Sequence, residues 1–217
     1  MKFFIDTANL NQIKEAQEMG ILDGVTTNPS LMAKEGITGK NNILKHYVDI
    51  CNIVDGDVSA EVIATDFEGM IREGEELSEL HPQIVVKLPM IKDGIKACKY
   101  FAERDVKTNV TLVFSPGQAL LAAKAGATYV SPFIGRLDDI STDGLNLIAE
   151  IRQIYDNYGF DTQILAASVR HTMHVIDCAK IGADVMTGPL SSIEGLLKHP
   201  LTDIGLAKFL EDYKKGN

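Results

Sequence analysis

Short β-type segments alternate with amphipathic helical segments along the whole chain, and this alternation limits the possible folds more than any other feature. The expected strands are eight runs, at residues 2–7, 24–28, 58–63, 84–89, 108–114, 129–134, 162–168 and 183–188. Strands that alternate with helices form parallel sheets, either closed into a barrel or doubly wound. Because the alternation is complete and its count is eight, the sequence predicts an α/β fold of the (β/α)8 TIM-barrel type.

Helical periodicity fills the segments between these strands. The clearest patterns lie at residues 9–20, 66–80, 95–105, 115–126, 143–159 and 171–182, and four of them end in a glycine of the kind that terminates helices, at Gly20, Gly126, Gly159 and Gly182. No linker rich in Pro, Gly or Ser divides the chain. We therefore expect residues 1–217 to form a single domain.

One further helix is expected at residues 201–215, beyond the eighth strand and helix unit. Leu206, Phe209, Leu210 and Tyr213 form an apolar stripe with the i, i+3, i+4, i+7 spacing of one helix face. This extra helix has two possible partners, its own barrel or a neighbouring subunit.

Composition narrows the classes of partner and the cellular compartment. The net charge of −9 argues against nucleic acid or an acidic membrane as a partner, so an anionic substrate would need a local group of basic residues. The three scattered cysteines are typical of reduced thiols. The N-terminus reaches Asp6 before an apolar run of signal length develops, and no run of transmembrane length follows. These features predict a soluble cytoplasmic protein.

A lysine stands inside one of the most apolar strands, in the run IVVKLPM at residues 84–90. Burying an amine without a partner is costly and favours its neutral form, which is a nucleophile. Lys87 could therefore carry chemistry, or it could lie at the strand end and reach water along its stem.

The other strands decide between these readings, because polar residues recur near their ends. Residues two apart share a face of a strand, and active sites of such barrels lie at the carboxyl ends of the strands. The polar positions are Asp6, Thr26, Asn28, Ser59, Glu61, Asn109, Thr111, Ser131, Ser168 and Arg170. Together they predict a polar mouth around Lys87, suited to Schiff-base catalysis in which Asp6 and Glu61 transfer protons. The alternative for these carboxylates is an ion pair with Lys87 that has no catalytic role.

An ordered set of motifs resembles the transaldolase family. The motifs are IDTAN, GVTTNPSL, SAEV, VVKLP, TNVTLVFSPGQALLAAKAGA, YVSPFIGRLDD and AASVR. The length resembles the short branch that includes fructose-6-phosphate aldolases. The resemblance implies that Lys87 forms the Schiff base, that Asp6 is the general acid/base, and that Glu61 and Thr111 position a catalytic water. It further implies that Asn28, Asn109 and Ser131 bind the dihydroxyacetone unit and that Arg136, Ser168 and Arg170 bind phosphate.

Two positions separate transferases from simple aldolases within this resemblance. Members that only cleave typically carry Gln and Tyr where this chain has Glu61 and Phe133. The expected reaction is therefore transfer of a dihydroxyacetone unit from sedoheptulose 7-phosphate to glyceraldehyde 3-phosphate, in the pentose phosphate pathway. The alternatives are a fructose-6-phosphate aldolase and a sugar-phosphate-binding protein without turnover. The resemblance implies no metal or organic cofactor, phosphorylated sugars as substrates, and a homo-oligomer, possibly a decamer of two pentameric rings.

The spacing of two histidines suggests a metal site, but a structural role explains it better. His171 and His174 are three residues apart on an expected helix, yet no third ligand has a suitable spacing. We therefore expect a surface or capping role for these histidines.

Overall fold

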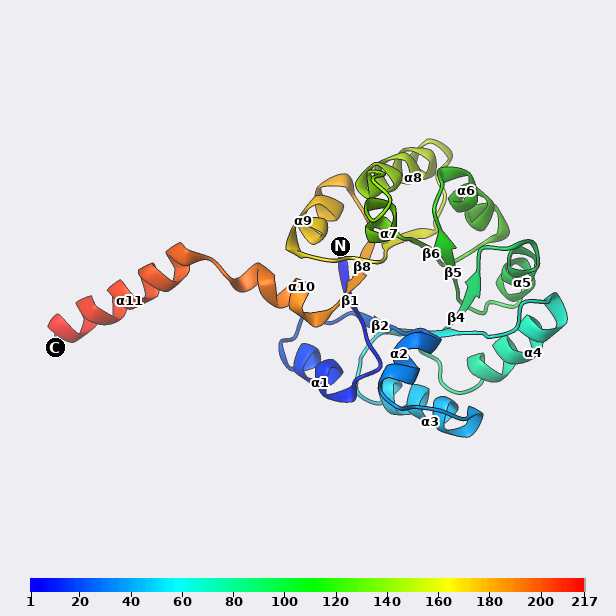
Figure 1. Cartoon of the computed structure of the whole chain (residues 1–217), viewed down its shortest axis with the longest axis horizontal. Coiled ribbons are helices and arrows are strands. Elements are labelled where there is room, and N and C mark those ends of the chain that lie inside the picture. Colours follow the sequence, from blue (N-terminus) through cyan, green and yellow to red (C-terminus); the bar gives the residue numbers. More distant parts are fainter. Residues whose placement is uncertain (217) are drawn as a thin grey trace.

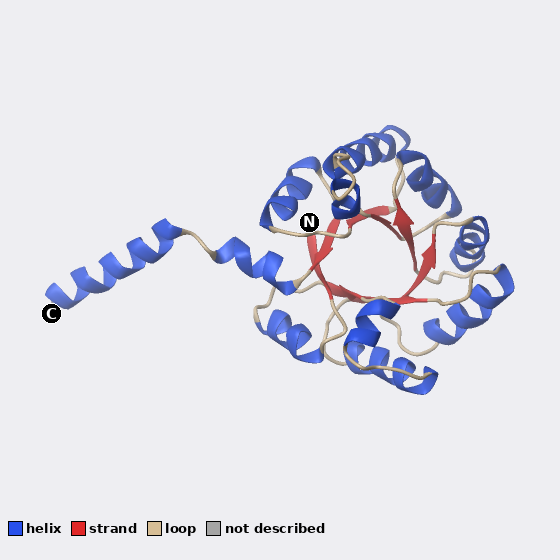
Figure 2. Ribbon diagram, in the orientation of Figure 1, coloured by secondary structure: helices blue, strands red, loops and turns tan. Residues whose placement is uncertain are grey.

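Eight parallel strands close into a barrel in the computed structural model, which describes residues 1–216. Each strand pairs with the next in sequence, and β1 pairs with β8 to close the ring seen in Figure 2. The strands are β1 (Lys2–Asp6), β2 (Gly24–Thr26), β3 (Asp57–Glu61), β4 (Ile84–Pro89), β5 (Thr108–Val113), β6 (Tyr129–Pro132), β7 (Gln163–Ala166) and β8 (Val185–Gly188). The predicted (β/α)8 barrel is confirmed.

The helices of the chain surround the barrel on its outer face, apart from the last one, which extends away from it (Figure 1). They are α1 (Leu10–Glu18), α2 (Pro29–Lys34), α3 (Lys40–Cys51), α4 (Phe67–Ser78), α5 (Lys92–Ala102), α6 (Pro116–Ala125), α7 (Ile134–Asp138), α8 (Gly144–Tyr158), α9 (Thr172–Ile181), α10 (Leu190–Glu194) and α11 (Pro200–Lys215), with a short 3-10 turn at Gly195–Leu197. Gly126, Gly159 and Gly182 are the left-handed caps of α6, α8 and α9, as the sequence predicts. Gly20 lies one residue beyond the cap of α1, also with positive φ.

Several expected strands are too long, and the excess residues belong to turns and helix starts. β2 ends at Thr26, so Asn28 does not share a strand face with Thr26 as predicted. Asn28 instead caps α2, where its side-chain oxygen accepts a hydrogen bond from the Leu31 amide at 3.0 Å. β7 ends at Ala166, so the prediction that Ser168 and Arg170 lie on strand seven is also wrong. The loop after β7 carries them.

The hydrophobic core has two parts, separated by the wall of the barrel. The larger part lies between the strands and the surrounding helices. The smaller part lies within the barrel and consists of Phe4, Val85, Tyr129, Leu165, Ala167 and Val185. Side chains alternate along a strand, so a residue two positions after an inner core residue also points inward, closer to the carboxyl ends. The inner core therefore forms an apolar floor below the barrel mouth.

α11 extends away from the barrel rather than packing on it (Figure 1). The described part of this helix contains no buried residue. Leu206, Phe209, Leu210 and Tyr213 are 58%, 74%, 53% and 72% exposed. Of the two partners considered for this helix, its own barrel is therefore not the one seen. Across residues 1–216, no helix is long and apolar enough to cross a membrane.

Candidate active site

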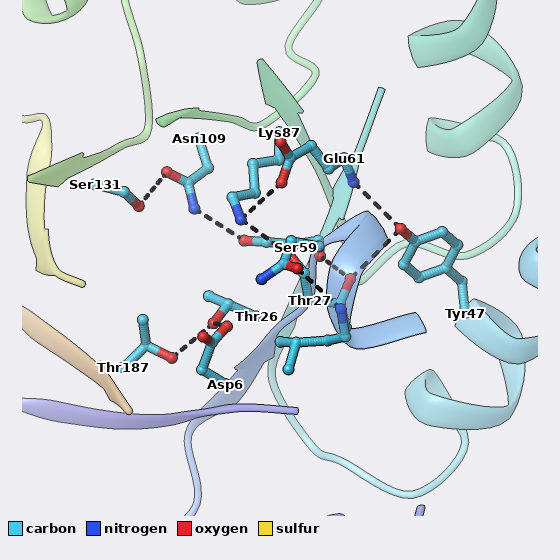
Figure 3. Close-up of polar contacts among 12 residues, drawn as sticks. Asp6, Thr26, Thr27, Tyr47, Ser59, Glu61, Lys87, Asn109, Ser131 and Thr187 are labelled. Carbon is cyan, nitrogen blue, oxygen red and sulfur yellow. Dashed lines mark hydrogen bonds and ion pairs between the residues drawn. The ribbon is translucent and has the colours of Figure 1, made fainter. Parts of the chain in front are cut away.

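Three neighbouring strands bring the central polar residues together. In the parallel register, Glu61 of β3 pairs with Lys87 of β4, and Lys87 pairs with Asn109 of β5. Residues paired in register point to the same side of a sheet, so the three side chains enter the barrel mouth side by side (Figure 3). The predicted polar mouth around Lys87 is present.

Lys87 is buried and has two polar partners. Only 5% of the residue is exposed. Its Nζ lies 2.9 Å from the Glu61 Oε2 atom and donates a hydrogen bond to the Thr27 carbonyl, also at 2.9 Å (Figure 3). The lysine therefore does not reach water along its stem. The ion pair considered for Glu61 exists, and its presence alone does not distinguish a structural from a catalytic lysine.

Asp6 lies in the same mouth, at the end of β1, without an ion pair to Lys87. Its Oδ1 atom accepts a hydrogen bond from the Thr26 hydroxyl at 2.7 Å, and that hydroxyl is also 2.7 Å from the hydroxyl of Thr187 on β8 (Figure 3). Thr26, which is itself hydrogen-bonded to Thr187, thus fixes one oxygen of the carboxylate. The other carboxylate oxygen is suited to accept a proton from a bound molecule.

A buried amide connects two serines on the other side of the lysine. Asn109 is fully buried, donates to the Ser59 hydroxyl at 3.1 Å and accepts from the Ser131 hydroxyl at 2.7 Å. Thr111, two residues further along β5, differs from these residues. Its Oγ1 atom is buried and makes no hydrogen bond to any residue in the described part of the chain. An unsatisfied buried hydroxyl costs free energy unless a water or ligand bonds to it, so Thr111 marks a position for one.

A cavity of about 490 Å³ and a smaller one of about 270 Å³ both approach this group of residues. The smaller, more polar cavity is the barrel mouth. It is lined by nine of the eleven predicted site residues, namely Asp6, Asn28, Lys87, Thr111, Ser131, Phe133, Arg136, Ser168 and Arg170. Glu61 and Asn109 do not line it but contact Lys87 and Ser131, respectively, which do. The structure thus brings all eleven residues together.

Two arginines give this cavity a basic side within an acidic chain. The Arg136 guanidinium lies 5.1 Å from the centre of the Phe133 ring, and Arg170 forms an ion pair of 2.7 Å with Asp139. Ser168, between β7 and Arg170, has the unusual φ of +59°. Such strained backbone occurs at functional sites where surrounding structure holds it. The Ser168 carbonyl accepts a hydrogen bond from the Gly135 amide at 3.1 Å.

The histidine pair serves the start of α9. His171 is the N-cap and its Nδ1 accepts from the His174 amide at 3.3 Å, which confirms a capping role for His171. His174 is buried, so a surface role for it is wrong. Its Nε2 lies 3.0 Å from Asp138, and its Nδ1 accepts from the Arg170 amide at 3.2 Å. Within residues 1–216, no group of three or more His, Cys, Asp or Glu residues could hold a metal ion.

Three residues of the site were missed as candidates. Thr187 lies two residues after Val185 of the inner floor, so strand alternation alone could have identified it. Thr27 contributes its backbone carbonyl, which no side-chain pattern reveals. Tyr47 lies on α3, in a segment where no helix was among the expected patterns, and its hydroxyl contacts Thr27 and the Glu61 amide (Figure 3).

Comparison with known proteins agrees with the geometry. The family model described as "Transaldolase/Fructose-6-phosphate aldolase" matches residues 3–215. A "Probable transaldolase" of Flavobacterium psychrophilum is 84% identical, and one of Cytophaga hutchinsonii is 75% identical, each over 100% of both chains. A solved structure of thiamine phosphate pyrophosphorylase from Pyrococcus furiosus has a TM-score of 0.61 at 16% identity, covers 86% of this chain and 84% of its own, and shares the fold alone. The chain belongs to the transaldolase/fructose-6-phosphate aldolase family.

Proposed function

We propose that the chain is a transaldolase that transfers a dihydroxyacetone unit from sedoheptulose 7-phosphate to glyceraldehyde 3-phosphate, yielding erythrose 4-phosphate and fructose 6-phosphate in the pentose phosphate pathway. The observation that carries this proposal is the buried Lys87 amine, 2.9 Å from the Glu61 carboxylate, in a cavity that also contains Asp6 and two arginines. A buried amine next to a carboxylate and a second, separate acid is the arrangement that imine chemistry on a sugar phosphate requires.

Imine formation begins at the ion pair. Lys87 transfers a proton to Glu61, and the neutral amine adds to the ketone carbon of the donor sugar to give a carbinolamine. Protonation of the carbinolamine hydroxyl and loss of water then give the iminium ion. The unsatisfied Thr111 hydroxyl supports a role in holding the water that relays these protons, because that hydroxyl has hydrogen-bonding capacity that no protein group uses.

Asp6 acts in the next step, the cleavage of the carbon–carbon bond. It removes the proton from the sugar hydroxyl next to that bond, the bond breaks to release an aldehyde, and the electron pair moves into the iminium to form an enamine. The hydrogen bond from Thr26 orients Asp6 for this proton transfer. Asn28, Asn109 and Ser131 bind the hydroxyl groups of the dihydroxyacetone unit that stays on Lys87.

Phosphate binds at the basic side of the cavity. Arg136 and Arg170 supply charge-assisted hydrogen bonds, and Ser168, two residues after the end of β7, lines the same cavity. This location agrees with the general preference of TIM barrels for phosphate near the later strands. When phosphate binds, Arg170 either gives up its ion pair with Asp139 or contacts Asp139 and the phosphate at the same time.

Phe133 and Glu61 favour transfer over simple cleavage. The enamine on Lys87 either attacks a new aldehyde or is protonated to an iminium ion, which water then hydrolyses to release free dihydroxyacetone and the lysine amine. The Phe133 ring lines the cavity, where it packs edge-to-face on Phe114 with ring centres 5.7 Å apart. A phenyl ring carries no hydroxyl to hold water near the enamine, whereas a tyrosine at this position would.

Partitioning of the enamine tests the reaction class. The purified protein is given fructose 6-phosphate with and without an acceptor aldehyde, and released dihydroxyacetone is compared with transfer product. We expect little release without acceptor, and an increased ratio of cleavage to transfer in Phe133→Tyr, where about 1.4 kcal/mol in relative barrier is a tenfold change. A wild-type ratio that favours cleavage would make this chain a fructose-6-phosphate aldolase, and absence of both reactions would favour a sugar-phosphate-binding protein.

We propose further that the protein is a homo-oligomer and that it lies in the cytoplasm. The exposed apolar stripe of α11 supports a homo-oligomer in which this helix packs on a neighbouring subunit, and the resemblance to the short branch points to a decamer of two pentameric rings. Cys51, Cys98 and Cys178 are buried free thiols, which supports a reducing cytoplasmic location.

A further inference from the structure

Tyr47 brings a hydroxyl from an outer helix to the back of the site. It lies on α3, is only 3% exposed, and its ring lines the apolar cavity of about 490 Å³ that Glu61 also lines. This cavity is bounded by residues of α2, α3 and α4. Tyr47 therefore forms part of the wall of an apolar cavity that reaches Glu61, the carboxylate partner of Lys87.

The Tyr47 hydroxyl joins the two chain segments that hold Lys87. It accepts a hydrogen bond from the Glu61 backbone amide at 3.3 Å and lies 3.4 Å from the Thr27 hydroxyl (Figure 3). Glu61 and Thr27 are also the two partners of the Lys87 amine, through a carboxylate and a backbone carbonyl. One phenol oxygen thus contacts both residues that hold that amine, through their backbone amide and hydroxyl rather than through the groups that bond to the amine.

Strand pairing supports Glu61 on its β4 side but not on its β2 side. The last residue pair between β2 and β3 is Thr26 with Ser59, so β2 ends before it reaches Glu61. Thr27 is linked to β3 by its own amide and hydroxyl, which donate to the Ser59 carbonyl at 3.4 Å and 3.1 Å. Tyr47 extends this connection from Ser59 to Glu61, two residues further along β3, because its hydroxyl accepts a hydrogen bond from the Glu61 amide where β2 no longer pairs.

The hydroxyl remains protonated under all ordinary conditions. Burial raises the pKa of Tyr47 above its usual value, and the nearby Glu61 charge raises it further, although the hydrogen bonds from Thr27 and the Glu61 amide act in the opposite direction. A neutral phenol can accept the Glu61 amide without adding a second negative charge beside the ion pair.

We propose that Tyr47 is a positioning residue for imine formation, whose hydroxyl fixes the backbone at Glu61 and Thr27 so that both partners stay within hydrogen-bonding distance of the Lys87 amine. This inference rests on the proposed function. Tyr47 does not line the polar cavity, so it does not touch the bound sugar. Its loss should therefore slow the proton transfers between Lys87 and Glu61 while it leaves substrate affinity almost unchanged.

Tyr47→Phe tests this role, because it keeps the ring in the cavity wall and removes only the hydroxyl. The matched control is Tyr155→Phe, since Tyr155 is also fully buried and its hydroxyl donates to the Ala119 carbonyl at 2.8 Å, outside the site. Each variant is mixed with fructose 6-phosphate and quenched with borohydride after increasing times, so that trapped imine gives the rate of its formation. KM, kcat and the midpoint of thermal unfolding are measured in parallel.

We expect Tyr47→Phe to form imine about tenfold more slowly, which corresponds to about 1.4 kcal/mol in barrier, with kcat reduced to match and KM within about twofold. Tyr155→Phe should lose stability but form imine at the wild-type rate. Equal imine rates in wild type and Tyr47→Phe would overturn the inference.

If Tyr47→Phe does not fold, Thr27→Val is the variant to test. It keeps the Thr27 carbonyl and removes the hydroxyl that links Tyr47 to Ser59. An imine rate equal to that of the wild type would also overturn the inference. Failure of the wild type to form imine on Lys87 would instead refute the proposed function.

Discussion

At the scale of single residues, the charge on Lys87 is tolerated because its partners are built into the neighbouring strands. The Glu61 side chain is 16% exposed and the Lys87 side chain 6%, so the carboxylate keeps some contact with solvent while the amine does not. Taking both groups out of water costs about as much free energy as their attraction returns. The pair is therefore weak evidence for stability, and its retention is better explained by chemistry.

Replacement of Lys87 separates its contribution to catalysis from its contribution to stability. Lys87→Met should abolish turnover and lower the free energy of unfolding, by less than the roughly 3–5 kcal/mol typical of breaking a fully buried pair, because Glu61 is partly exposed. The double variant Lys87→Met with Glu61→Gln should recover stability but not activity. Urea unfolding and the transfer assay check both statements, with Lys107→Met as a control that breaks an ion pair to Asp57 outside the cavity. Residual turnover in Lys87→Met would contradict its assignment.

Arg170 should contribute affinity for phosphate rather than catalysis. Loss of a charge-assisted hydrogen bond costs roughly 1.5–3 kcal/mol, so Arg170→Ala should raise KM for phosphorylated sugars more than tenfold. KM for unphosphorylated analogues should change little. Arg104→Ala is the control, because Arg104 stacks on Tyr100 outside the cavity. Equal losses for both substrate classes would mean that Arg170 is structural.

At the scale of elements, strand alternation predicts which polar side chains point into the barrel mouth, because they lie two residues after the apolar residues of the inner floor. Phe4 precedes Asp6, Val85 precedes Lys87 and Tyr129 precedes Ser131 by this spacing. The alternation does not show where a strand stops. Asn28 follows two threonines and reads as strand, but its side chain caps α2, and Pro29 begins that helix. A capping residue that follows an apolar run fits both assignments until the tertiary structure selects one.

The turn after β7 should make stability depend on pH through His174. Burial lowers the pKa of His174 in the folded state, with smaller effects in the same direction from His171 and Arg170 and an opposing effect from Asp138. Below about pH 6.5 the unfolded chain therefore binds a proton at this histidine more readily than the folded chain does, so acidification decreases the free energy of unfolding. The stability contributed by neutral His174 is present above that pH.

Thermal unfolding between pH 7.5 and 5.5 measures this contribution. The unfolding midpoint of the wild type should fall across this range, and His174→Gln should show a smaller fall, because glutamine cannot take up the proton. His81→Gln, on the turn before β4, serves as the control for replacing a histidine elsewhere. Identical pH dependence in wild type and His174→Gln would show that other groups are responsible.

At the scale of the whole molecule, the closed barrel follows from the count and order of the strands, whereas the position of α11 does not. The stripe at Leu206, Phe209 and Leu210 shows that one helix face is apolar, but an apolar face does not specify its partner. In the structure this face is exposed on a helix that extends away from the ring (Figure 1).

Removal of α11 tests its role in assembly. A chain that ends at His199 should give a smaller species by light scattering than the full chain, because the apolar contact between subunits is lost. Leu206→Ser with Phe209→Ser in the full-length chain is the matched variant, since it keeps the helix length and removes part of the stripe. An unchanged mass in both variants would exclude α11 from the interface.

The central claim is that Lys87 forms a covalent imine with the donor sugar, and trapping of this imine tests it most directly. The protein is treated with borohydride in the presence of fructose 6-phosphate, digested and analysed by mass spectrometry. We predict loss of activity that depends on the sugar, and a reduced dihydroxyacetone adduct on the peptide that contains Lys87. Lys107, which is paired with Asp57 at 2.8 Å and lies outside the cavity, should remain unmodified. No adduct, or an adduct on Lys107 or another lysine, would contradict the account.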